Sequence, residues 1–333
     1  GEARVRFDEN NVEEHYGQDL QDMEVLNYVP RGMDEEFPCG RRSSHQWKIL
    51  AGVRLTAELA ENFYYIGALQ TEEIGAEVAS PDLPEHLVTL YQNSSSGLSS
   101  EHQKLLATTL QEYPDVFSRS DTDLGKTALE VHQIPTGDAK PVRLPPRRAP
   151  MHLQADLDKQ IRTMIEQGIV EECTSPWAFP LVVVKKKSGE NRICVDYRPL
   201  NQLTLKDGHP LPRLDDSLDA LAHAKVYTTL DMTSGYHQVE VAPEDRDKTA
   251  FVDGRGHHLR YKTMPFGLCN APATFQRLME KVLEGMIWKH VVVYLDDVVI
   301  YSKSIEEHME HLKEVLERFR KHNLKLKPRK CEL

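Results

Sequence analysis

The feature that most constrains this chain is a pair of apolar runs separated by two carboxylates. Val291 to Leu295 and Val298 to Tyr301 are rich in β-branched residues, and Asp296 and Asp297 stand between them. Two such runs around a short polar step predict the strands of a β-hairpin. Ionised carboxylates at the tip of a hydrophobic hairpin repel each other, so their position indicates a cation site. The alternative is that these two aspartates have no function, because aspartate is common in solvated turns. For an isolated pair of aspartates this is the simpler explanation.

A third aspartate raises the case for a metal site. The segment from Val226 to Leu230 alternates as a strand and leads into Asp231. If this strand neighbours the hairpin in one sheet, three carboxylates come within reach of two Mg²⁺ ions about 3.5–4 Å apart. Magnesium prefers oxygen ligands, and a set of aspartates without His or Cys favours Mg²⁺ or Mn²⁺ over zinc.

The remaining pattern predicts an α+β fold, because strands and helices alternate after residue 178. A helical face is expected at Leu153, Leu157, Ile161, Met164 and Ile165. His308 and His311 share a face of the last helix and are expected to be solvated. The other expected elements are an extended proline-rich strap from Leu144 to Pro150, a helix stop at Gly168, a hairpin at residues 178–197, a helix capped by Asn270, and a last helix with a capping box of Ser304 and Glu307.

The first third of the chain gives a weaker signal. Residues 1–95 show no sustained periodicity, and the polar stretch at residues 92–97 is typical of a flexible linker. Ser100 and Gln103 have the spacing of a capping box for a short helix after it. We therefore expect a boundary near residue 96.

The net charge of −11 argues at first against a nucleic-acid partner, but the charge is unevenly distributed. Residues 140–213 hold 13 Lys/Arg against 8 Asp/Glu, whereas residues 1–139 hold 10 against 25. A local basic surface with Arg147, Arg148 and Lys185–Lys187 remains available for a phosphate backbone. No apolar run approaches the roughly 18 residues of a membrane span, and the five scattered cysteines predict no disulfide framework. A reducing, cytoplasmic compartment without a membrane partner is expected.

Four ordered motifs resemble those of reverse transcriptases, and they are most similar to the gypsy-type LTR retrotransposon group. They are residues 191–201 (NRICVDYRPLN), 230–238 (LDMTSGYHQ), 264–276 (MPFGLCNAPATFQ) and 294–297 (YLDD). The resemblance covers residues 97–333 and implies the fingers and palm of a right-hand polymerase within a retrotransposon Pol polyprotein. It implies RNA-directed DNA polymerase activity with two Mg²⁺ ions. The implied partners are a primed RNA or DNA template and deoxynucleoside triphosphates, in a virus-like particle if the element is active.

The resemblance also implies roles for individual residues. Asp231, Asp296 and Asp297 would be catalytic and would bind the metal ions together with Met232. The ring of Tyr236 would clash with a ribose 2′-hydroxyl and so select deoxynucleotides. The implied nucleotide contacts are Lys186, Lys187, Arg192, Tyr236, Phe266 and Gly267. The implied template or primer contacts are Tyr294, Asp196, Arg198, Asn201, Pro265 and Gln276.

Three regions are expected from the resemblance: residues 1–95, unassigned or a polyprotein linker; residues 96–150, a pre-fingers segment with the strap; and residues 151–333, fingers and palm. Only 36 residues follow Asp297, so a thumb and a ribonuclease H domain are expected to be missing and activity to be weak. Two alternatives remain open. One is a truncated or domesticated relative that binds nucleic acid without polymerising it. The other is an RNA-dependent RNA polymerase, against which Tyr236 and Tyr294 argue.

Overall fold

The computed structural model describes residues 82–147, 150–185, 191–210, 212–294 and 297–333, and these form two compact units. Unit 1 consists of Glu130–His209 and Tyr236–Phe275. Unit 2 consists of residues 82–129 together with Pro210–Gly235 and Gln276–Leu333. Each unit therefore combines segments that are far apart in the sequence.

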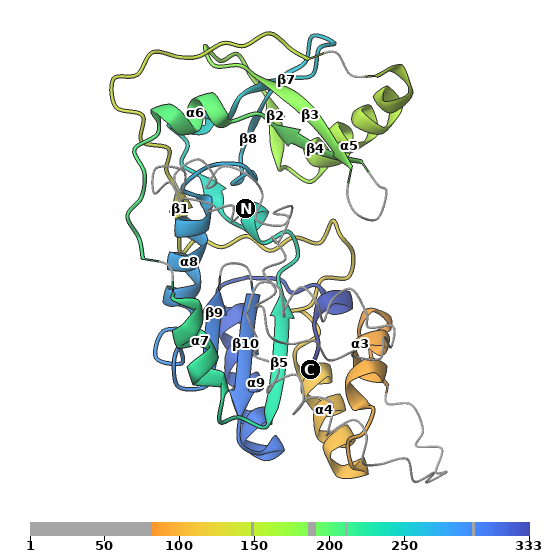
Figure 1. The fold of residues 1–333 in the computed structure, drawn as a ribbon. Helices are drawn as coiled ribbons and strands as arrows, with labels where there is room; N and C mark the ends of the chain where they lie inside the picture. Colours follow the sequence, from red (N-terminus) through yellow and green to blue (C-terminus); the bar gives the residue numbers. More distant parts are fainter. Residues whose placement is uncertain (1–81, 148–149, 186–190, 211, 295–296) are drawn as a thin grey trace, which may run out of the picture. The chain divides into compact units, whose positions relative to one another are not determined.

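Unit 1 is built on a five-stranded sheet with the strand order β2-β8-β7-β3-β4 (Figure 1). The strands are β2 (Val170–Glu172), β3 (Phe179–Lys185), β4 (Asn191–Val195), β7 (Phe251–Val252) and β8 (His258–Tyr261). β3 pairs antiparallel with β4, which confirms the hairpin predicted at residues 178–197, and parallel with β7. β1 (Val131–His132) pairs parallel with β6 (Glu240–Val241) beside this sheet.

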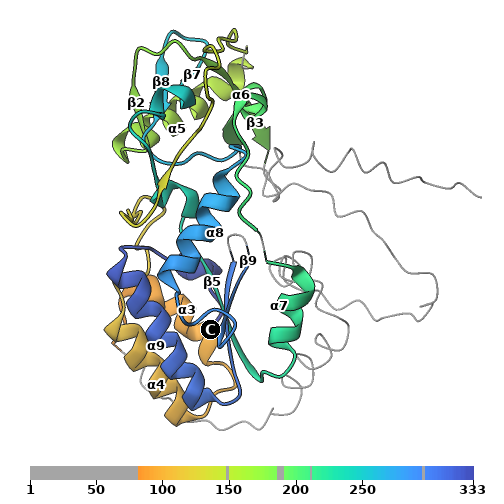
Figure 2. The same cartoon turned by 90° about the vertical axis from the view of Figure 1, so that its left-hand side faces the viewer.

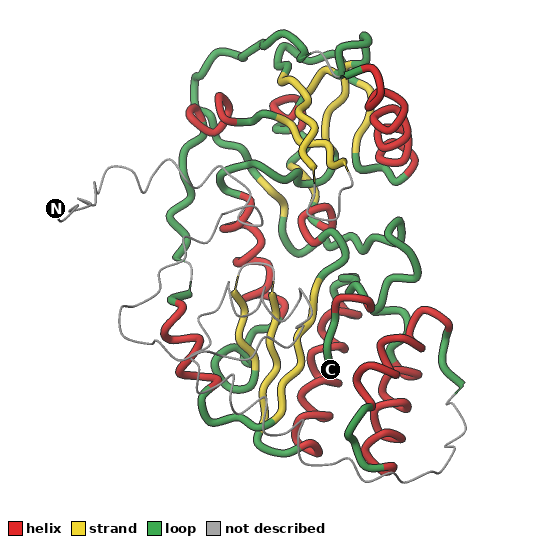
Figure 3. The backbone as a smooth tube through the Cα atoms, turned by 45° about the vertical axis from the view of Figure 1, so that its right-hand side comes forward, coloured by secondary structure: helices red, strands yellow, loops and turns green. Residues whose placement is uncertain are grey.

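Helix α5 (Gln154–Glu166) covers part of the sheet of unit 1, beside strands β2 and β4 (Figure 3). Leu157 and Ile161 point into the core, as their spacing predicts. Ile165 is 40% exposed, so its assignment to the core was wrong. Gly168 adopts a φ of +69°, the left-handed conformation that commonly ends a helix, and confirms the predicted stop. The other helical elements that begin in unit 1 are η3 (Met151–Leu153), α6 (Arg198–Leu203), η5 (Arg246–Thr249) and α8 (Ala271–Val282).

Unit 2 is built on a three-stranded antiparallel sheet with the order β5 (Val226–Asp231), β10 (Asp297–Ser302) and β9 (Val291–Tyr294). Helix α9 (Ile305–Lys321) packs on β10 and β5 and contacts α4, whereas α7 (Leu214–Leu221) contacts β9; Figure 2 shows α7 on the opposite side of the sheet from α9. The remaining helical elements are α3 (Glu85–Ser95), α4 (Ser100–Glu112), η4 (Gly235–Gln238) and η6 (Pro328–Lys330).

The inner face of α9 buries Met309, Leu312, Leu316 and Phe319, as predicted. The Ser304 hydroxyl accepts a hydrogen bond from the Glu307 amide, which confirms the expected start of this helix. His308 was predicted to be solvated, but it is only 3% exposed. Its ring lies between the hydroxyls of Thr228 (2.8 Å) and Ser302 (3.0 Å), because the helix presents this position to the sheet.

Two local predictions on the flanks of these elements were wrong. Residues 92–95 are not a linker but the last turn of α3, because Leu87 and Leu90 bury one face of that helix. The cap of α4 is Ser99 rather than Ser100, since the Ser99 hydroxyl accepts from the His102 amide. Helix α8 begins directly after Asn270, as predicted, and the Asn270 carbonyl accepts from the Thr274 amide. The Asn270 side chain accepts from the Asp207 amide and donates to the Leu205 carbonyl.

The segment of residues 325–332 runs antiparallel beside β5, and we call it the flanking segment. Thr229 and Glu332 exchange two backbone hydrogen bonds of 2.8 and 3.0 Å, and the Thr233 amide donates to the Lys325 carbonyl at 3.0 Å. Between these contacts the Lys327 amide donates to the Asp231 carbonyl at 2.8 Å. Within the described ranges, no helix is both long and apolar enough to cross a membrane.

Candidate active site

Two of the predicted catalytic aspartates face each other across neighbouring strands of unit 2. Asp231 is the last residue of β5 and Asp297 is the first residue of β10, and the two are direct partners in the antiparallel ladder. Residues that are direct partners project to the same face of a sheet with their Cβ atoms about 4.5–5.5 Å apart. The ladder therefore brings together two carboxylates that are far apart in the sequence, as expected if the strand that ends at Asp231 neighbours the hairpin.

Asp296, Lys186 and Lys187 lie outside the described residues. Among the residues that the structure does describe, no group of three or more His, Cys, Asp or Glu side chains is placed to hold a metal ion. The described part of the predicted metal site is thus the pair of Asp231 and Asp297. On its other side Asp297 has Tyr294 of β9 as its ladder partner, which puts this predicted template or primer residue next to the carboxylates.

The flanking segment supplies a cation to this pair. The Lys330 ammonium lies 2.8 Å from Oδ2 of Asp231, and both side chains are about one-third exposed, at 34% and 29%. Met232 follows Asp231 and is buried, with its backbone bridged to Leu326 of the flanking segment. Its thioether is a poor ligand for Mg²⁺, so a metal contact at Met232 would have to use the backbone carbonyl.

A stacked cluster of rings in unit 1 holds three of the predicted nucleotide contacts. The rings of Tyr236 and Phe266 stack with centroids 4.9 Å apart, and the Arg192 guanidinium lies 4.2 Å from the centre of the Phe266 ring. Tyr236 also packs on the buried Phe275 at 5.4 Å. A guanidinium over an aromatic face is an attractive arrangement, so the cluster orients Arg192 on strand β4.

His237 supports this cluster from the side. Its ring meets Phe266 edge to face at 5.6 Å and stacks on Tyr261 at 6.1 Å. Burial, together with the positive charge of Arg192, lowers the pKa of His237 to about 4. The imidazole is therefore neutral at physiological pH and acts as a packing group beside the arginine.

The turn that carries Phe266 is fixed by one side-chain amide. Gly267 adopts a φ of +90°, which L-residues avoid, and follows Phe266 in this turn. Asn201 of α6 donates to the Gly267 carbonyl at 2.8 Å and accepts from the Cys269 amide at 3.0 Å. The Asn201 amide, predicted to contact template or primer, thus holds the turn of residues 266–269.

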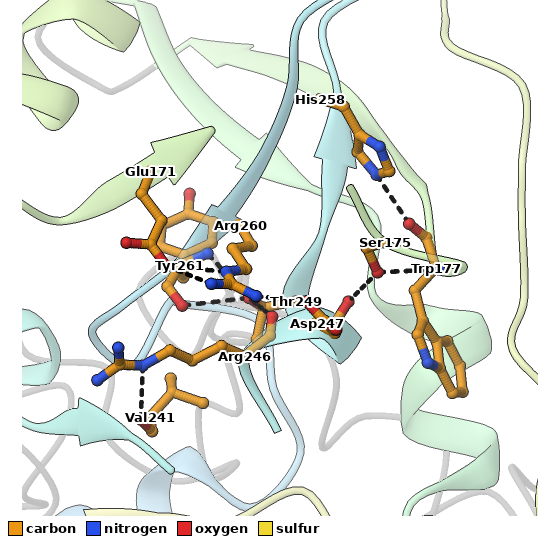
Figure 4. A network of polar contacts seen from close by, with 10 residues as sticks. All are labelled: Glu171, Ser175, Trp177, Val241, Arg246, Asp247, Thr249, His258, Arg260 and Tyr261. Atoms are coloured by element: carbon orange, nitrogen blue, oxygen red, sulfur yellow. Dashed lines mark hydrogen bonds and ion pairs between the residues drawn. The ribbon is translucent and has the colours of Figure 1, made fainter. Parts of the chain in front are cut away.

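Strand β8, which leads into this turn, is anchored by a polar network (Figure 4). Arg260 donates to Glu171 of β2 at 2.8 Å and to Asp247 of η5 at 2.6 Å. The Thr249 hydroxyl accepts from the Tyr261 amide at 2.9 Å. These bonds join β8 to β2 and to η5 and thereby anchor the strand that precedes residues 264–267.

A buried carboxylate organises two exposed arginines elsewhere in unit 1. Asp196 accepts two hydrogen bonds of 2.8 Å from Arg198 and one of 2.6 Å from Arg147. The hydrogen bonds from Arg198 lower the pKa of Asp196, and the charge of Arg147 contributes in the same direction. The Asp196 side chain is 7% exposed, whereas those of Arg147 and Arg198 are 53% and 68% exposed. Each guanidinium, with five donors, keeps several for a further partner.

The last two predicted template or primer residues are buried. Pro265 lies within unit 1. Gln276 of α8 lies in unit 2, where its side-chain amide donates to Glu280. Sequence reasoning did not anticipate Lys330 beside Asp231, or the pairing of Arg147 with Asp196. Both pairs join residues that are distant in the sequence, and the basic character of the strap was the only available signal for the second.

The fold and the motifs agree with comparisons to known proteins. Crystal structures of the prototype foamy virus protease–reverse transcriptase superpose with a TM-score of 0.67 at 23% identity, covering 75% of this chain and 33% of that one. The same protein in complex with an RNA/DNA hybrid also gives 0.67, at 22% identity, over 79% of this chain and 35% of that one. Residues 184–333 match the family model for reverse transcriptase (RNA-dependent DNA polymerase). The chain therefore contains a reverse transcriptase domain, and the predicted α+β class is confirmed.

Within that class the chain is of the retrotransposon type. It is 42% identical over 184 residues to the retrovirus-related Pol polyprotein of transposon 297 from Drosophila melanogaster, covering 54% of the chain and 17% of the relative. It is 33% identical to that of transposon opus, covering 69% and 24%. The Tf2-3 polyprotein of Schizosaccharomyces pombe is 31% identical, covering 80% and 21%. The chain thus spans about a fifth of the length of these curated relatives. The predicted gypsy type is consistent with these relatives.

Proposed function

We propose that this chain provides the catalytic core of an RNA-directed DNA polymerase that adds deoxynucleotides to a primer 3′-hydroxyl. The observation that carries the proposal is the direct pairing of Asp231 with Asp297 at the ends of β5 and β10. A sheet gains nothing from two like charges in this position, since directly opposed like charges are destabilising. A cation requirement explains why both are carboxylates.

The donor set suits magnesium. Carboxylate oxygens on rigid strands are ligands that Mg²⁺ and Mn²⁺ accept, and exposure at the sheet edge leaves room for water and phosphates. We assign Asp231, Asp297 and the intervening Asp296 to two such ions, with Met232 as a backbone ligand. When bound, the ions would lower the pKa of the primer hydroxyl and neutralise charge on the triphosphate.

The ring cluster of unit 1 is assigned to the incoming nucleotide. Arg192 provides a guanidinium for the triphosphate and is oriented by the Phe266 ring. Tyr236 is fixed between Phe266 and Phe275, so its ring can restrict the sugar without itself moving. Gly267 and Asn201 hold the turn, and Lys186 and Lys187 remain proposed triphosphate contacts.

Template and primer are assigned to the phosphate-facing arginines and to Tyr294. The foamy virus enzyme has been solved with an RNA/DNA hybrid and with double-stranded DNA. In this chain, the exposed donors of Arg198 and Arg147 suit backbone phosphates, and Asp196 positions them. Pro265 and Gln276 would act through packing, because both are buried.

Primer extension tests the proposal. Wild-type chain and the single variants Asp231→Asn, Asp296→Asn and Asp297→Asn are compared on poly(rA)·oligo(dT) with Mg²⁺ and dTTP. Each variant should lose at least a hundredfold in rate, because the charge on the metal ligands is reduced while the size is kept. The exposed Asp219→Asn in α7 is the matched control and should retain activity. Unchanged synthesis in the three variants contradicts the metal assignment.

The same assay separates the two alternatives. A chain that binds primer–template but extends nothing, even at high enzyme concentration, would be the non-enzymatic relative. Extension with UTP at a rate equal to dTTP would indicate an RNA polymerase. The preserved carboxylate pair and the retrotransposon relatives favour the DNA polymerase.

A further inference from the structure

The Asp231 carboxylate has a basic neighbour on the side of β5 away from Asp297. β10 flanks β5 on one side, and the flanking segment runs along the other. The 3₁₀ turn η6 (Pro328–Lys330) projects from that segment between its contacts at Lys327 and Glu332. Its last residue, Lys330, places an ammonium 2.8 Å from Oδ2 of Asp231.

This contact differs from the other lysine contacts of the flanking segment. Lys325 pairs with Asp123 and Lys327 pairs with Asp121 at 2.7 Å, both in the loop after α4. Those aspartates have no assigned chemistry. Lys330 alone among these three binds a carboxylate that is also proposed to bind metal.

The turn holds Lys330 in place, which lowers the entropic cost of the pair. The Lys327 amide donates to the Asp231 carbonyl and the Cys331 amide donates to the Lys327 carbonyl, so the backbone on both sides of the lysine is fixed. A lysine side chain on a mobile loop loses more freedom on pairing than one on a fixed turn. A divalent cation and the Lys330 ammonium would compete for the same oxygens of the Asp231 carboxylate.

We propose that Lys330 is a displaceable counter-ion of Asp231, which stabilises the carboxylate pair in the metal-free protein and competes with a divalent cation for Asp231. This rests on the proposed role of Asp231 as a metal ligand. Lys330 is a positioning residue in this scheme. It keeps the two strand ends folded against their mutual repulsion, and it sets how tightly the site binds its ions.

Direct Mn²⁺ binding tests the competition. Free Mn²⁺ is followed by electron paramagnetic resonance in titrations of wild type, Lys330→Met and Lys330→Gln. Removing the competitor should tighten the dissociation constant about two- to fivefold, the range expected for losing a partly exposed ion pair. Lys327→Met removes the same charge from the same segment, but its side chain pairs with Asp121 and not with the Asp231 carboxylate, so binding should stay unchanged. If Lys327→Met tightens Mn²⁺ binding as much as the Lys330 variants do, the effect comes from the overall charge of the segment and the proposal is overturned. Unchanged or weaker Mn²⁺ binding in both Lys330 variants would also overturn it.

Thermal unfolding provides a second readout that is independent of activity. In EDTA, Lys330→Met should lower the Tm by about 1–4 °C, and saturating Mg²⁺ should abolish the difference, because the wild-type lysine is then displaced as well. In an Asp231→Asn background, the Lys330→Met effect should also vanish. A Tm loss that persists in Mg²⁺ or in the Asp231→Asn background would reduce Lys330 to an ordinary structural residue and overturn the proposal.

The two proposals fail in different ways. If Asp231→Asn leaves Mn²⁺ binding unchanged, Asp231 is not a ligand and the metal assignment of the proposed function fails. If Asp231→Asn weakens Mn²⁺ binding at least tenfold while neither Lys330 variant tightens it, the metal assignment stands and the counter-ion proposal fails.

Discussion

The packing of Tyr236 sharpens the sugar-selection hypothesis. Its ring lies between Phe266 and Phe275, so truncation to alanine removes the steric block and also opens a cavity. Tyr236→Ala should reduce the preference for dTTP over UTP at least tenfold, or about 1.4 kcal/mol. The measurement is the ratio of kcat/KM for the two nucleotides, which does not depend on the fraction of folded enzyme. Tyr236→Phe keeps the ring and should keep the preference; equal loss in both variants would remove the steric role.

His308 makes the stability of unit 2 depend on pH. Burial lowers its pKa to about 4, with a smaller contribution from His311. Between about pH 6.5 and pH 4 the unfolded chain binds a proton on this ring that the folded protein does not. The free energy of unfolding therefore falls as pH falls through this window, by about 3 kcal/mol in total from this group.

Urea unfolding at pH 7.0, 5.5 and 4.5 checks this. His308→Gln should be less stable than wild type at pH 7, because it loses one of two hydrogen bonds, but should lose less stability on acidification. His152→Gln, at an exposed position in η3, is the control and should follow wild type. A His308→Gln profile parallel to wild type would contradict the assignment.

For individual residues, the sequence predicted which side chains carry chemistry better than it predicted which side chains they contact. Asp231 and Asp297 were predicted as neighbours because strand ends and carboxylates are visible in a local pattern. Lys330 was not, because its contact depends on the turn of η6 and on backbone pairing over about a hundred residues. Asp196 was expected to meet nucleic acid, yet its short side chain is buried under two longer arginines.

Among the elements, the turn after β8 carries the clearest prediction. A Cβ on Gly267 would meet the Tyr197 ring at 3.7 Å, which is ordinary contact, so the cost of Gly267→Ala comes from the positive φ. We expect a loss of about 1–2 kcal/mol in the free energy of unfolding together with a raised KM for dNTP. Gly254→Ala, at a φ of +80°, should show a similar stability loss without the KM change. Urea titration and steady-state kinetics separate the two; an unchanged KM in Gly267→Ala would detach the turn from nucleotide binding.

Element boundaries show where sequence reasoning is limited. The hairpins, α5 and α9 were predicted because their apolar periodicity is strong. The linker at residues 92–97 was wrong because a serine-rich composition hides the helical face made by Leu87 and Leu90. The start of α8 after Asn270 was predicted, but the side-chain partners of Asn270 in the loop after α6 were not, because they are about 65 residues away in the sequence.

At the scale of the whole molecule, the net charge of −11 coexists with a local basic site at Arg147 and Arg198. The salt dependence of nucleic-acid binding should report the contribution of this site. Each phosphate contact contributes about 0.9 to the slope of log K against log salt. The double variant Arg147→Ala/Arg198→Ala should therefore reduce the slope for a primer–template by up to about 1.8. Fluorescence anisotropy at increasing KCl measures it. Arg255→Ala, whose guanidinium binds Asp158 of α5, is the control; an identical slope in the double variant would contradict the phosphate assignment.

The fold class followed from the order of motifs and strands, but the division into two units did not. Each unit is assembled from separated segments, and α8 begins in one and ends in the other. Long-range pairings such as β3 with β7 leave no local signal, since each strand reads the same whichever neighbour it takes. Residues 1–81 lie outside the described part of the chain, so the predicted regions stay predictions.

The flanking segment also covers one edge of the sheet in unit 2. β5 is one of the two outer strands of the sheet in unit 2, and an outer strand offers unpaired amides and carbonyls to a second chain. The amides of Thr229 and Thr233 donate to the flanking segment, and the carbonyls of Thr229 and Asp231 accept from it, so these groups are paired within the molecule. Cleavage of the chain before residue 325 would therefore remove Lys330 and also expose the unpaired backbone amides and carbonyls of β5, which would favour aggregation.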